Sequence, residues 1–171
     1  MIRNAATSLA LAALFVAQAA SAATSTAPCL DRKQAEDLVT FSLPVLVDGV
    51  AERCRATLST SAFLLRGDPG ARYAADADAA WPAAQGTLTR LFGNITSGFL
   101  TEEIQRTVLE QAVTAALVSK VAVKDCATID RALTALAPLP GRNVAQTVVI
   151  AYDLFSRSRD DLPFKLCEVA Q

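Results

Sequence analysis

Hydrophobic residues recur at helical spacing along most of the chain, and no run of residues alternates as a β-strand would. The clearest stripe contains Val39, Leu43, Leu46, Val50 and Cys54, which follow one another at spacings of four, three, four and four residues. The stripe keeps its phase across Pro44, so it predicts one long helix that kinks near this proline instead of two independent helices. The whole pattern predicts an all-α, single-domain bundle of about five or six helices.

The first helix has a strong start and an unusual interior. Asp31 is a good N-cap residue, and Gln34 stands three residues later, where it completes a capping box. Gly49 weakens the helix by up to about 1 kcal/mol relative to alanine, so we expect another helix to pack closely against it.

A connection and a second helical segment follow. Residues 58–70 contain several turn residues and form the connection. Residues 71–92 have helical spacing, and we expect Pro82 to divide this segment into two parts. Within it, the edge at residues 76–78 is predicted to be exposed and Trp81 is predicted to point inward.

Thr101 and Asp125 are predicted to cap the next two helices. The first of these runs from Glu102 to about Val121, and Glu102 and Arg106 have the spacing of an ion pair on its surface. The inward stripe of the second helix is Cys126, Ile129, Leu133 and Leu136.

The last main helix is the most hydrophobic one. It is predicted to run from Val144 to about Ser158, with Asn143 as its cap. Its residues are apolar nearly all round the helix, so we expect it to lie at the centre of the bundle.

Residues 1–22 have the pattern of a cleaved secretory signal peptide. Arg3 precedes a short apolar run over residues 9–17, and the sequence that ends at Ala22 fits a cleavage site, so we expect cleavage near Ala22. The run is well short of the roughly 20 residues of a spanning helix, so we expect no stable membrane insertion after cleavage. Residues 23–171 then form one helical domain that is periplasmic or secreted.

Four cysteines lie in the exported part of the chain: Cys29, Cys54, Cys126 and Cys167. Export and the even number favour two disulfides over a zinc site, which would need closely spaced pairs. A continuous helix of about 24 residues is some 36 Å long, whereas the Cα atoms of a disulfide lie within about 7 Å. We therefore disfavour a Cys29–Cys54 bond and expect each end of the first helix to be tied to Cys126 or Cys167, in either order.

Several chemistries are excluded or find no support in the composition. The chain contains no histidine, which excludes Ser-His-Asp catalysis, Cys-His catalysis and histidine zinc sites. Its formal net charge is −1, so it has no basic excess that would favour nucleic acid. The seven glycines are scattered and form no phosphate-binding or dinucleotide-binding motif, so we expect no cofactor and no metal.

Three acidic residues are the candidates for chemistry. Asp48 and Glu52 stand four residues apart on the first helix, where they could act as acid and base or hold a divalent cation. The favoured interpretation is a solvated helix face on which Glu52 pairs with Arg55. Asp153 lies in the most hydrophobic helix, and we expect a structural ion pair with Arg157 in preference to catalysis.

The leading functional hypothesis is a non-enzymatic binding or structural protein that contacts a protein partner in the cell envelope. One alternative is a carrier that holds a small apolar ligand between helices. Its predicted lining is Phe41, Trp81, Phe92, Phe99 and Phe155. The other alternative is a hydrolase or lyase that works through Asp or Glu residues.

Overall fold

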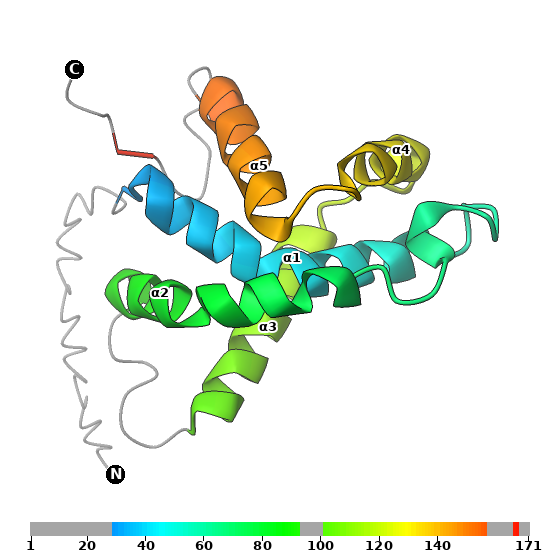
Figure 1. The fold of residues 1–171 in the computed structure, drawn as a ribbon. Coiled ribbons are helices and arrows are strands. Elements are labelled where there is room, and N and C mark those ends of the chain that lie inside the picture. The colour runs from blue at the N-terminus through cyan, green and yellow to red at the C-terminus, as the bar shows by residue number, and fades with distance from the viewer. Residues whose placement is uncertain (1–28, 93–100, 157–165, 168–171) are drawn as a thin grey trace, which may run out of the picture.

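The computed structural model describes residues 29–92, 101–156 and 166–167, and these residues form an all-α fold (Figure 1). The helices within them are α1 (Arg32–Cys54), α2 (Ala74–Phe92), α3 (Glu102–Val118), α4 (Cys126–Leu136) and α5 (Gly141–Ser156). Three short 3₁₀ turns join them: η1 (Phe63–Leu65), η2 (Ala71–Tyr73) and η4 (Val123–Asp125). The predicted signal peptide lies outside the described residues.

Helix α1 is the axis of the bundle, and α2, α3 and α5 pack around it (Figure 1). The residues from Thr40 to Leu43 are all buried, and four consecutive residues cover more than one complete turn of a helix. Side chains of α1 also take part in each of the three hydrophobic clusters of the core. α1 therefore has neighbours on several sides, and its buried residues are not confined to one face.

The predicted start and continuity of the first helix are confirmed. The Asp31 carboxylate accepts a hydrogen bond from the Gln34 N–H at 2.8 Å, and the Gln34 side chain accepts one from the Asp31 N–H at 3.2 Å. Pro44 lies inside α1, and the helix continues without a break to Cys54. The axis of α1 changes direction near its middle in Figure 1, as expected of a proline that removes one backbone hydrogen bond.

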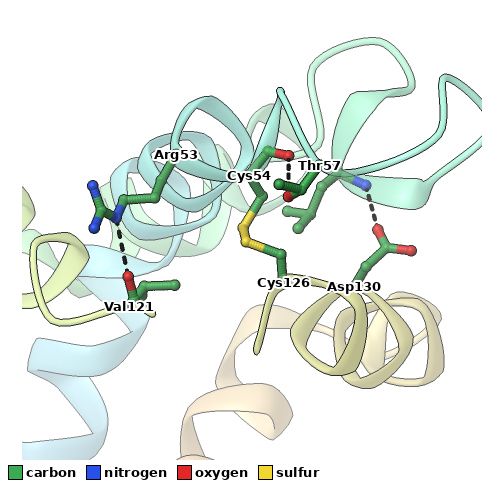
Figure 2. The surroundings of a disulfide bond; sticks show 7 residues. Arg53, Cys54, Thr57, Val121, Cys126 and Asp130 are labelled. Carbon is green, nitrogen blue, oxygen red and sulfur yellow. Dashed lines mark hydrogen bonds between the residues drawn. A yellow bond between two sulfur atoms is a disulfide. The ribbon is translucent and has the colours of Figure 1, made fainter. Parts of the chain in front are cut away.

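Two disulfides tie the two ends of α1 to later parts of the chain, as the length of the helix predicted. Cys29 is bonded to Cys167 just before α1, and Cys54 in its last turn is bonded to Cys126 at the start of α4 (Figure 2). Cys54 and Cys126 are 0% and 1% exposed, so the second disulfide belongs to the core. Next to the Cys29–Cys167 disulfide, the Cys167 N–H donates a backbone hydrogen bond of 2.8 Å to the Leu30 carbonyl.

Two predictions about α2 are wrong. Pro82 does not divide the helix, which runs unbroken from Ala74 to Phe92. The edge at residues 76–78 is not uniformly exposed, because Ala77 is fully buried. Ala77, Ala80 and Ala84 are small, so the backbone of α2 lies close to α1 along its length, and this contact outweighs the one hydrogen bond that the proline removes. Trp81 is buried, as predicted.

The prediction that the last helix occupies the centre is also wrong. Val144, Ala145 and Val149 are buried, but Ile150, Leu154 and Phe155 are exposed. α5 packs with one side against α1, and Asp153 near its end still pairs with Arg32 at the start of α1 (Figure 1). The position at the centre is already occupied by α1.

Helix α3 packs where the glycine of α1 predicted a close neighbour. A Cβ atom at Gly49 would lie 2.7 Å from Val118 Cγ2 and 3.1 Å from Thr114 Cγ2, so a larger residue would have to move these α3 side chains. Thr101 caps α3 as predicted, accepting a hydrogen bond from Ile104 N–H at 3.4 Å.

The predicted ion pair between Glu102 and Arg106 is not formed. Glu102 accepts a hydrogen bond of 2.6 Å from Trp81 Nε1. Arg106 forms ion pairs of 2.6 Å with Asp78 on α2 and 2.9 Å with Glu110. Glu102 and Arg106 thus each contact α2, and the partner of Arg106 within α3 is Glu110 in place of Glu102.

Two predicted caps do not form. Asp125 precedes α4, but its side chain makes no capping hydrogen bond. Asn143 lies inside α5, which begins at Gly141. The start of α5 is capped from another helix, because Asp76 Oδ2 accepts a hydrogen bond of 2.6 Å from Gly141 N–H. Sequence patterns reveal only local caps, so this one escaped prediction.

Candidate functional site

The loop between α1 and α2 borders a hollow of about 480 Å³ on the surface, which we call the arginine hollow. Its wall on the loop side is formed by Phe63, Arg66, Asp68, Pro69 and Arg72. Thr134 and Ala137, at the end of α4, form the opposite side.

Two carboxylates from neighbouring helices hold this loop in place. Asp48 Oδ1 on α1 accepts a hydrogen bond of 2.9 Å from Gly70 N–H. Asp130 Oδ1 on α4 accepts one of 2.9 Å from Leu64 N–H, next to the Cys54–Cys126 disulfide (Figure 2). The second half of the loop is thus fixed to helices at two points, Leu64 and Gly70.

The turn between these two anchors also has a defined conformation. Gly67 has φ +69°, in the left-handed region that glycine adopts without strain. Asp68 Oδ1 accepts a hydrogen bond of 3.1 Å from Ala71 N–H. Gly70 is buried, and a Cβ atom there would overlap the Asp48 carboxylate.

Arg66 and Arg72 bring two positive charges to the hollow. The Arg72 guanidinium carbon lies 5.4 Å from the centre of the Phe63 ring and 5.9 Å from that of Tyr73, so two rings position it. Neither arginine has a carboxylate within ion-pair distance in the described part of the chain.

The pKa of Asp48 lies above its ordinary value. Partial burial is the main cause, and the negative charge of Asp68 adds to it, whereas the hydrogen bond from Gly70 N–H acts in the opposite direction. The observed role of Asp48 is to anchor the loop through its hydrogen bond with Gly70 N–H.

The other two acidic candidates have separate partners. Glu52 is exposed and pairs with Arg55 at 2.6 Å, which lowers the pKa of Glu52 through a hydrogen bond and the opposite charge. Asp153 forms an ion pair of 3.5 Å with Arg32 on α1, whereas the predicted partner Arg157 lies outside the described residues. The three acids have different partners and do not converge on one site.

A second candidate is the exposed part of α5, which we call the α5 apolar surface. It consists of Val148, Ile150, Leu154 and Phe155, which are 40%, 51%, 62% and 73% exposed. Sequence analysis singled out this helix for its apolar residues but placed them in the core. The apolar residues all round α5 were the signal that could have revealed this surface, because a helix of this kind that lies on the surface must expose some of them.

Of the aromatic residues predicted to line a ligand cavity, the three whose side chains the structure describes do not share one space. Phe41 and Trp81 pack against each other, with ring centres 4.9 Å apart, in the core between α1 and α2. Phe155 is on the surface of α5. Phe99 and the side chain of Phe92 lie outside the described residues.

No protein-family model matches this chain, and comparisons with curated proteins and with solved structures found no match. Within the described residues, no group of three or more Cys, Asp or Glu side chains could hold a metal ion. None of the described helices is long and apolar enough to cross a membrane. The arginine hollow and the α5 apolar surface are therefore the features that indicate a function.

Proposed function

We propose that this chain is an exported, non-enzymatic binding protein that contacts another protein of the cell envelope through the α5 apolar surface. The secretory signal pattern of residues 1–22 and the two disulfides support export to an oxidising compartment such as the periplasm. The observation that carries the proposal is the exposure of Ile150, Leu154 and Phe155 on one half of one helix. Ile150 and Leu154 are four residues apart and share one face of α5, and exposed apolar residues that gather in this way mark interaction surfaces.

The energy available at this surface is sufficient for an interface centre. Complete burial of a Leu, Ile or Phe side chain is worth about 1.5–3 kcal/mol relative to exposure. These three side chains are between half and three-quarters exposed, so a partner that covers them gains about 1–2 kcal/mol from each. A few apolar anchors of this size dominate the affinity of many interfaces.

The charges nearby describe the partner. In the described part of α5, the charged residues are Arg142 at its start and Asp153. Asp153 pairs with Arg32 of α1, which draws its charge toward the bundle. The α5 apolar surface therefore fits a partner with an apolar, uncharged patch, and binding should depend little on salt.

The frame beneath this surface is rigid. The start of α5 is held by Asp76, and Val144 and Val149 are anchored in the core. A surface that is ordered before binding loses little conformational entropy on association.

A photo-crosslinking experiment in cells that naturally produce the protein tests this proposal. The photoreactive residue p-benzoylphenylalanine replaces Phe155, and the expected result is a crosslink to one discrete envelope protein. Adding Leu154→Glu should abolish the crosslink, because it places a charge in the centre of the interface. The matched control is Leu117→Glu, which puts the same charge on a leucine of α3 that is 48% exposed and should leave the crosslink intact.

Other outcomes overturn the proposal. Crosslinks only between copies of this chain, with a dimer in sedimentation analysis, would assign the α5 apolar surface to self-association. Crosslinks only to lipid would assign it to a membrane. A protein crosslink that persists in the Leu154→Glu variant would show that the contact does not depend on this surface.

A further inference from the structure

We propose that the arginine hollow is a second binding site, which takes a small carboxylic acid with an apolar body. The site is separate from the α5 apolar surface and does not depend on the function proposed for it. Its volume is about 480 Å³ and it is largely open to solvent, so a bound ligand would stay partly exposed.

The charges of the hollow select the ionised group. Arg66 and Arg72 supply two guanidinium groups, and each guanidinium can bind a carboxylate through two parallel hydrogen bonds. Because neither arginine has an ion pair in the described residues, a ligand would not have to displace a carboxylate of the protein. The lining residues carry a net charge of about +1, because Asp68 offsets one arginine. The Asp48 and Asp130 carboxylates that anchor the loop add negative charge beside it, so the balance favours a singly charged carboxylate over a dianion.

The rest of the wall selects the body of the ligand. The Phe63 ring, Pro69 and Ala137 are apolar, so they favour a ligand whose body is aromatic or aliphatic. A bare inorganic anion would leave this part of the wall without a partner.

The loop is arranged before any ligand arrives. The hydrogen bonds from Gly70 N–H to Asp48 and from Leu64 N–H to Asp130 fix the loop on both sides of Arg66, and Arg72 follows the Gly70 anchor by two residues. The rings of Phe63 and Tyr73 restrict Arg72 itself. A site of this kind needs little reorganisation on binding, which favours affinity.

An NMR titration of the exported chain with both disulfides intact tests the proposal. The probe is 3-phenylpropionate, added up to about 10 mM, and the expected result is saturable binding in the millimolar range or tighter. The largest shifts should fall on the amides of Gly67 and Gly70 and on the side-chain Nε–H groups of Arg66 and Arg72. The uncharged analogue 3-phenylpropanol should bind at least about tenfold more weakly, because it lacks the charged acceptor.

Variants of the lining residues provide signs in both directions. Arg66→Gln and Arg72→Gln should each weaken binding of 3-phenylpropionate about tenfold. Asp68→Asn should tighten it about two- to threefold, since the amide oxygen can still accept from Ala71 N–H while the repulsive charge is gone. The matched control is Arg90→Gln, which removes the same charge from an exposed arginine at the other end of α2 and should change nothing.

Three results would overturn the proposal. The first is equal binding of 3-phenylpropanol and 3-phenylpropionate. The second is tighter binding of inorganic phosphate than of 3-phenylpropionate, which would indicate a site for bare anions. The third is an unchanged affinity in both arginine variants, or the absence of saturable shifts in the loop.

Discussion

Removing the Cys54–Cys126 disulfide should destabilise this protein more than removing the Cys29–Cys167 disulfide. The perturbation is a pair of double variants, Cys54→Ala with Cys126→Ala and Cys29→Ala with Cys167→Ala, which leave no unpaired thiol. Both bonds close long loops, but only the first one is buried in the core.

The loop-closure terms of the two disulfides are nearly equal. The Cys54–Cys126 bond spans 72 residues, for which the chain-entropy relation gives about 4.4 kcal/mol at room temperature. The Cys29–Cys167 bond spans 138 residues. We call Cys54–Cys126 the inner bond and Cys29–Cys167 the outer bond. When the inner bond is intact, however, the shortest covalent path between Cys29 and Cys167 is about 66 residues, which gives about 4.3 kcal/mol by the same relation.

Packing therefore decides the order of the two variants. Cys54 and Cys126 are fully buried, and replacing both with alanine removes two sulfur atoms from the interior, at a further cost of about 1–2 kcal/mol. Cys29 is exposed and Cys167 is half-buried, so their replacement adds little to the loop term. Since typical domains are stable by about 5–15 kcal/mol, the inner double variant should be close to unfolding.

Urea unfolding monitored by circular dichroism measures both free energies of unfolding. The reduced wild-type protein is the control, because it loses both crosslinks but keeps all four sulfur atoms. The reasoning is refuted if the outer double variant is the less stable of the two. It is also refuted if the inner double variant loses less than about 1 kcal/mol, since both terms would then be absent.

Two further predictions concern positions on α1. Gly49→Ala should lower the free energy of unfolding by about 1 kcal/mol, because the overlap with Val118 outweighs the gain in helix propensity. The control, Gly86→Ala on α2, meets open space and should raise the free energy of unfolding by about 0.5–1 kcal/mol. Equal shifts of the two variants in thermal unfolding would contradict the close contact at Gly49. Asp48→Asn should raise the free energy of unfolding at about pH 7, because a raised folded pKa means that the ionised carboxylate is less favourable in the folded state than in the unfolded one. This gain should disappear as the pH falls through the folded pKa of Asp48. If Asp48→Asn instead lowers the stability at neutral pH, the hydrogen bond from Gly70 N–H to the ionised carboxylate outweighs the cost of burying its charge.

Local patterns in the sequence predicted most of the helical segments, and they argued against a Cys29–Cys54 bond without fixing which later cysteine each one meets. The unbroken stripe from Val39 to Cys54 implied a helix too long for its flanking cysteines to meet, and the structure pairs each with a distant cysteine. The capping box at Asp31 depends on residues within one turn, so it too was predictable. Such features need no knowledge of which helices are neighbours.

The arrangement of helices could not be predicted in the same way, because two helices competed for the centre. Both α1 and α5 carry apolar residues on most of their circumference. Small residues decide the outcome: Gly49 admits α3, and Ala80 and Ala84 of α2 pack with Phe41. α1 thus accepts close neighbours on several sides, whereas α5 meets α1 along one side only.

Several aspartates of this chain have structural roles that no local sequence pattern indicates. Asp48, Asp76 and Asp130 each accept a backbone hydrogen bond from a segment that is 22, 65 or 66 residues away. Two of these bonds fix the loop that carries the arginines, and the third fixes the start of α5. An aspartate in this role must accept a hydrogen bond at one fixed position, and it need not exchange a proton. These carboxylates therefore hold distant segments in place through backbone hydrogen bonds, and the two surfaces proposed for binding lie on those segments.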